Sequence, residues 1–166
     1  DADHPDTDAL PQPVIEGTVW VANEFGHSVS AIDAATERVR LTIEGIDSPH
    51  NLQVSPDGES VWVVSGHTAT AVMVDARTGT VHGTVPTGGD PAHIVVSPDG
   101  STAYATNGAD GTLTIIDVPT MTSTGTIAVG PSAHGLRPSP DGSQLLVANA
   151  GGTTVSLVDT QTGVTT

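Results

Sequence analysis

A four-residue motif recurs at a constant spacing along this chain. Ser-Pro-Asp-Gly begins at Ser55, Ser97 and Ser139, so successive copies lie 42 residues apart. Two further series share that offset: Asp33, Asp75, Asp117 and Asp159, and the positions Trp20, Trp62, Tyr104 and Leu146. Independent markers in one register indicate internal repeats, and a period of this length is typical of a repeat architecture in which similar units stack side by side.

Each repeat contains four short stretches with the length and the apolar pattern of β-strands. In the second repeat they are expected at about residues 52–54, 60–64, 70–74 and 80–85. Turns rich in Pro, Asp and Gly separate them, and in such turns the Asp side chain caps backbone N–H groups. Four antiparallel strands in about 42 residues are the signature of one propeller blade. The sequence therefore predicts an all-β fold, a β-propeller with about four blades present.

The residues at the end of the second strand of each repeat carry a family resemblance. They read Trp20-Val21-Ala22-Asn23, Trp62-Val63-Val64-Ser65, Tyr104-Ala105-Thr106-Asn107 and Leu146-Val147-Ala148-Asn149. Together with Ser-Pro-Asp-Gly and Ile/Val-Asp-x-x-Thr-Gly, these segments resemble the YVTN family of β-propeller repeats. The third repeat departs from the last motif, because it reads Asp117-Val118-Pro119-Thr120-Met121. The resemblance implies the fold, and it implies little about function because folds of this kind host many activities.

The repeat register divides the chain into a tail and four blades. Residues 1–16 form an acidic N-terminal tail, and blades are expected at 17–48, 49–90, 91–132 and 133–166. The first blade is predicted to lack its inner strand, because two prolines in Leu10 to Pro13 disfavour one. The fourth is expected to be incomplete. Since propellers of the resembled family usually close with seven blades, we expect a half or fragment of a ring, completed by a missing segment or a second chain.

Charge and composition exclude several classes of function. The chain has 19 acidic and 4 basic residues, all of the latter Arg, for a net charge of -15. Nucleic-acid binding needs clustered cations that this chain cannot assemble. The absence of Cys excludes disulfides and thiolate metal sites, and no apolar run is long enough for a membrane span. A Cys-free, acidic chain suits a secreted, periplasmic or cell-surface protein.

Histidines gather on one predicted face of the propeller. Alternate turns of an antiparallel meander lie on opposite faces, and the connections that vary between repeats share one face, where function is usually placed. His50, His93 and His134 open the innermost strand of three successive blades, so they should ring the mouth of the central channel. Imidazole suits copper or zinc, and three His make an adequate first shell. His27 and His67, in neighbouring loops, are outer candidates for the same metal site.

A structural role is the alternative for these histidines, which could pack between blades and bond backbone carbonyls. The register also weakens the predicted cluster. His50 and His134 are equivalent, 84 residues apart, whereas His93 comes one residue late in the repeat. Adjacent strand residues point to opposite sides, so this offset predicts that His93 faces away from the other two.

Two functional hypotheses follow. The first is an extracytoplasmic binding or interaction protein that uses the variable loop face at the channel mouth, with a small-molecule or protein ligand that the sequence does not identify. The alternative is a metal-binding propeller, with copper oxidoreductase as its catalytic form. No catalytic motif is found: the repeated Asp residues are interpreted as turn caps. Trp20, Trp62 and Tyr104 are interpreted as inter-blade core rather than a platform for a ligand.

Overall fold

The computed structural model describes residues 16–166, and it has fourteen antiparallel strands in four sheets. The tail and the segment Leu10 to Pro13, where the first blade was predicted to lack a strand, lie almost entirely outside the described residues. The first sheet holds β1 (Thr18–Asn23), β2 (Ser28–Asp33) and β3 (Arg38–Glu44), with a short 3-10 helix, η1 (Glu24–Gly26), between β1 and β2. The second holds β4 (Pro49–Val54), β5 (Ser60–Ser65), β6 (Thr70–Asp75) and β7 (Val81–Pro86).

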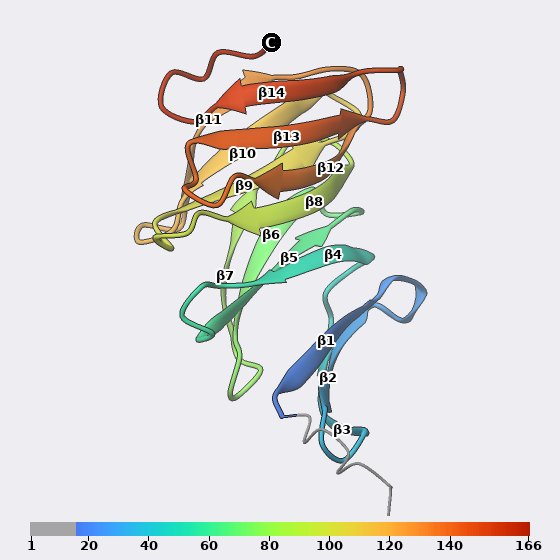
Figure 1. Cartoon of the computed structure of the whole chain (residues 1–166). Helices are drawn as coiled ribbons and strands as arrows, with labels where there is room; N and C mark the ends of the chain where they lie inside the picture. Colours follow the sequence, from blue (N-terminus) through green and yellow to red (C-terminus); the bar gives the residue numbers. More distant parts are fainter. Residues whose placement is uncertain (1–15) are drawn as a thin grey trace, which may run out of the picture.

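The remaining two sheets repeat this plan. The third holds β8 (Pro91–Val96), β9 (Thr102–Asn107), β10 (Thr112–Asp117) and β11 (Thr122–Ala128). The fourth holds β12 (Ala133–Pro138), β13 (Gln144–Asn149) and β14 (Val155–Asp159). Figure 1 shows the sheets following one another as successive blades, each a meander of sequence neighbours. The predicted β-propeller fold is confirmed. Within residues 16–166, no helix is long and apolar enough to cross a membrane.

The inner strand of the second blade is longer than the sequence suggested. It was expected at about 52–54, but β4 begins at Pro49. Proline is tolerated as the first residue of a strand, and a β-bulge directly after it accommodates the polar residues that made this stretch look irregular. The pairing of β4 with β5 shifts register between Pro49 and Asn51. The inner strands therefore extend to the loop face, where the histidines lie.

Apolar side chains between successive blades form the core. Between the second and third blades, Trp62 is fully buried and packs with Ile94 and Ile116. Tyr104, which is 7% exposed, packs in the equivalent core between the third and fourth blades. The interpretation of these two aromatics as inter-blade core is confirmed. Trp20 is only partly buried, although it contacts the core between the first two blades.

The repeated aspartates cap turns, as predicted. Asp75 accepts hydrogen bonds from the backbone N–H groups of Arg77 and Thr78, and Asp141 accepts them from Ser143 N–H and from the Ser139 hydroxyl. These bonds favour the charged carboxylate, so the Ser139 hydroxyl and its neighbours lower the pKa of Asp141 to about 2. Gly58, Gly100 and Gly142 all have φ near +75° as the last residue of the Ser-Pro-Asp-Gly turn, a conformation that favours glycine.

Candidate metal centre

Three inner strands from successive blades lie side by side and carry the predicted histidines. β4 contacts β8, and β8 contacts β12, so that the three strands follow one another around the axis (Figure 1). A non-glycine residue with positive φ precedes each strand at equivalent positions: Ser48 at 46°, Asp90 at 54° and Ser132 at 51°. This repeated left-handed residue turns the chain from the outer strand of one blade into the inner strand of the next. His50, His93 and His134 consequently start from comparable backbone positions.

The structure brings the three imidazoles together. One ring nitrogen from each of His50, His93 and His134 lies within 4.8 Å of the others. The ring centroids are 4.9 Å apart for His93 and His134, 5.3 Å for His50 and His134, and 6.0 Å for His50 and His93. His50 is exposed, and the other two are half-buried. The prediction that His93 faces away from the other two was therefore wrong.

β-Bulges explain why the alternation rule failed. At the start of each inner strand, two residues stand opposite one on the neighbouring strand: the register shifts between Pro49 and Asn51, between Pro91 and Ile94, and between Ala133 and Leu136. A bulge bends the strand and re-aims its side chains. In the repeat register His93 corresponds to Asn51 and not to His50. The bulge nevertheless directs the His93 side chain toward the rings of His50 and His134. An offset of one residue thus does not exclude a residue from the site.

Hydrogen bonds within the third blade and between neighbouring blades hold the bulged segments. The Thr106 hydroxyl accepts from His93 N–H at 2.9 Å and donates to the His134 carbonyl at 2.8 Å. The Asn51 side-chain carbonyl accepts from Ile94 N–H at 3.2 Å. These polar side chains satisfy backbone groups that the bulges remove from the strand ladder. Sequence reasoning missed Thr106 and Asn51. The 42-residue offset between Asn51 and His93 was the one signal that could have found Asn51.

His50 also makes the kind of contact that a structural histidine would make. Its Nδ1 lies 2.8 Å from the Ala92 carbonyl of the next blade. Since a carbonyl can only accept, Nδ1 is the donor in this contact, and in the neutral tautomer with Nδ1 protonated the lone pair is on Nε2. A backbone carbonyl on one ring nitrogen is a common way to orient a metal-binding imidazole. The structural contact and metal binding through the other nitrogen are therefore compatible.

His93 is held in its neutral form. Burial, followed by the neighbouring His134, His50 and Arg137, lowers its pKa from 6.5 to about 4. Its Nδ1 is buried and has no hydrogen-bond partner in the structure. A buried nitrogen without a partner is uncommon in proteins, and a bound ligand would account for it. Neutral imidazole is also the form that binds metals.

The pKa of His93 predicts how the stability of the metal-free protein depends on pH. Its folded-state pKa lies below its unfolded-state value, so the unfolded chain binds more protons between these two values. The contribution of His93 to stability should be constant above pH 6.5, fall between pH 6.5 and about 4, and change no further below that. Urea midpoints measured at pH 7.5, 5.5 and 4.5 test this. His93→Gln should flatten the profile, whereas the exposed His82→Gln should keep it; equal profiles in all three proteins would contradict the prediction.

The outer candidates form a separate group. His27 Nδ1 lies 2.6 Å from Asp47 Oδ1, and His67 Nδ1 lies 3.4 Å from the same oxygen. The two rings are 6.4 Å apart between centroids, and they do not join the inner three histidines in one ligand set. His67 nevertheless lines a cavity of about 220 Å³ that His50 and His134 also line, together with Glu24 and Asp90. This cavity connects the inner histidines to the loop face.

Comparisons with known proteins place the fold more clearly than the function. No protein-family model and no curated protein matches the chain. Among solved structures, the hydrazine synthase of Kuenenia stuttgartiensis superposes with a TM-score of 0.84 and 26% identity, over 89% of this chain and 44% of that one. The likeness shows a β-propeller fold. This chain spans less than half the length of that neighbour, and 1138 solved chains match, so fold similarity alone does not select an activity.

Proposed function

We propose that this propeller is a metalloprotein that holds one copper or zinc ion on His50, His93 and His134. The convergence of three imidazole nitrogens within 4.8 Å, from three different blades, carries this proposal. The donor set is suited to both metals. Two of the three rings are prepared for binding, since His50 keeps Nε2 free and His93 stays neutral at physiological pH.

The arrangement favours an open site over a closed structural one. Structural zinc sites have four protein ligands, whereas sites that act on substrates keep a position for water or a small ligand. Here two of the three ligands, His50 and His134, border the cavity of about 220 Å³ on the loop face, which has room for such a ligand. Zinc would supply a Lewis acid there. Copper would supply one-electron chemistry, and in that form the protein would act as a copper oxidoreductase.

Metal titration of protein purified without a polyhistidine tag tests the proposal. Isothermal calorimetry with Cu(II) and, separately, with Zn(II) should show one ion bound per chain with micromolar affinity or better. The His50→Ala/His134→Ala double variant should lose this binding, and His82→Ala should keep it. If neither ion binds the native chain with micromolar affinity, the metalloprotein proposal fails.

An interaction scaffold is the second candidate, and apolar blade faces favour it. On the fourth blade Leu146 is 52% exposed and Val155 is 61% exposed. The equivalent positions of the third blade, Tyr104 at 7% and Leu113 at 0%, are covered by the blade that follows. An apolar face of this kind is suited to contact with a further blade, supplied by a second chain or by another segment. This role agrees with the YVTN-type repeats and with an extracytoplasmic protein; a strictly monomeric native particle without additional blades would contradict it.

A further inference from the structure

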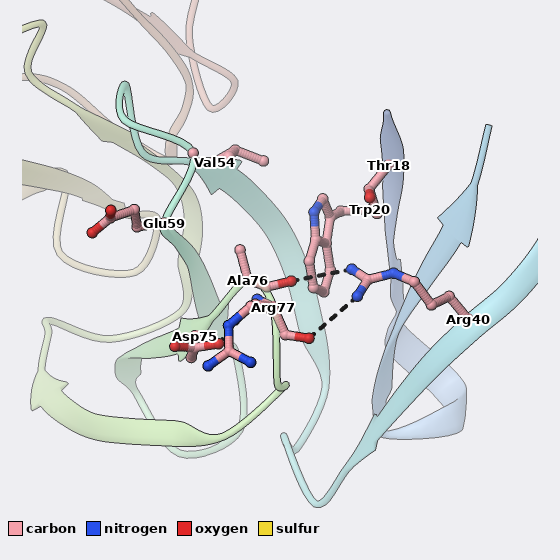
Figure 2. Close-up of a pocket in the computed structure, with 9 residues that line it drawn as sticks. Thr18, Trp20, Arg40, Val54, Glu59, Asp75, Ala76 and Arg77 are labelled. Carbon is pink, nitrogen blue, oxygen red and sulfur yellow. Dashed lines mark hydrogen bonds between the residues drawn. The ribbon is translucent and has the colours of Figure 1, made fainter. Parts of the chain in front are cut away.

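A large cavity lies away from the inner histidines, between the first and second blades. Its volume is about 720 Å³, within the range of roughly 300–1,000 Å³ typical of small-molecule sites. Figure 2 shows Trp20 and Arg40 on the side of the first blade, Glu59 on the opposite side, and the turn containing Ala76 between Glu59 and Arg40. The cavity therefore combines an aromatic wall with charged groups from two blades.

The next inter-blade interface shows that this space is not an obligatory feature of the repeat. Between the second and third blades, the core around Trp62 also includes Met73 and Val118. The equivalent residues one repeat earlier are Ala31 and Ala76, and Ala76 lines the cavity. Smaller side chains at both positions leave Trp20 partly exposed, whereas Trp62 is fully buried.

The charged groups around the cavity are balanced in sign. Two of the four arginines of the chain, Arg40 and Arg77, line it together with Glu59 and Asp75. Arg40 is held in place because its guanidinium donates to the backbone carbonyls of Arg77 at 3.2 Å and Ala76 at 3.1 Å (Figure 2). Two carboxylates oppose an anionic ligand, two guanidinium groups oppose a cationic one, and all four oppose a purely apolar one.

We propose that this cavity binds a neutral saccharide. A sugar ring presents an apolar C–H face, which the exposed part of the Trp20 indole would cover, and a rim of hydroxyls. Those hydroxyls can donate to the Glu59 carboxylate and accept from the N–H groups that Arg40 retains. This site is independent of the metal centre, since none of the three histidines lines it.

A panel of methyl glycosides and disaccharides tests the proposal on the full chain. Binding is followed by tryptophan fluorescence, to which buried Trp62 gives a constant background, and by saturation-transfer NMR. Glu59→Gln should weaken binding at least ten-fold, and so should Trp20→Ala, which is followed by NMR because it removes the reporting indole. Ala76→Val places in the cavity the side chain that Val118 contributes one repeat later, so it should fold normally and also weaken binding at least ten-fold. Glu44→Gln, on the exposed part of β3, is the matched control and should bind as the native chain does.

Three results would overturn the saccharide proposal. One is that no member of the panel produces a saturable signal. Another is that Ala76→Val binds with native affinity, which would place the ligand outside the cavity. The third is that acetate or a free amino acid displaces the sugar more effectively than a second sugar does, which would show that the site selects charge.

Discussion

His93→Ala is expected to weaken copper or zinc binding by at least about 100-fold, more than the loss that removing an outer-shell partner of a metal ligand causes. The structure gives two reasons. The change removes one of three ligands, so only two imidazoles, from the second and fourth blades, remain. It also removes a ring that burial keeps neutral, with a pKa of about 4, so that at physiological pH protons compete little with the metal for this ring.

Competition with a chelator of known affinity measures this change. His27→Ala and His67→Ala are the informative controls, because these residues bond Asp47 and lie outside the inner ligand set. They should bind metal within about three-fold of the native chain, a difference small beside the effect of a lost ligand. Native affinity in His93→Ala, or an equal loss in all three variants, would refute the three-histidine site.

Trp62→Ala is expected to cost about 3–5 kcal/mol of unfolding free energy, the range for removing a large aromatic from a packed core. Trp62 is fully buried between the second and third blades, where Ile94, Ile116 and Met73 surround it. Because successive blades contact mainly their neighbours, the loss of one interface weakens the whole stack.

Urea denaturation followed by circular dichroism measures the cost. Trp62→Phe keeps most of the apolar contact and removes an indole N–H that has no hydrogen-bond partner, so it should cost less than half as much. Trp20→Ala should also cost less, since Trp20 is partly exposed and borders a cavity. A cost for Trp62→Ala equal to that for Trp20→Ala would show that the two interfaces contribute alike.

Much of the fold could be predicted because the residues that define the repeat favour particular local backbone conformations. Asp and Gly favour turns, and alternating Val and Ile favour strands, through effects that extend over only a few neighbouring residues. The same reasoning predicted which face would carry His50 and His134. The strand was expected at about 52–54 with His50 at its opening, and β4 begins at Pro49, which is tolerated as the first residue of a strand.

The geometry of the candidate metal site was harder to predict from the sequence than the fold. The position of His93 depends on a bulge, which is defined by the pairing of two strands and not by the sequence of either one. The contact between His50 and the Ala92 carbonyl joins two blades, and so does the link from Thr106 to His134. The cavity beside Trp20 could not be predicted for a related reason. Its size depends on small side chains from two different blades that face each other, and this pairing is not visible in the sequence.

The bulges at the start of the inner strands also bear on how such sites arise. Because two residues stand opposite one in each bulge, the second, third and fourth blades each have two neighbouring positions from which a side chain can be directed toward the histidine cluster. The lineage of this chain could thus acquire a histidine at either of them without altering the strand pairing beyond. Asn51 and Gly135 hold the second position in the second and fourth blades, and the Asn51 side chain already bonds Ile94 N–H there. A donor group placed at position 135 would enlarge the ligand set, and so the scaffold offers a direct route to a different coordination number.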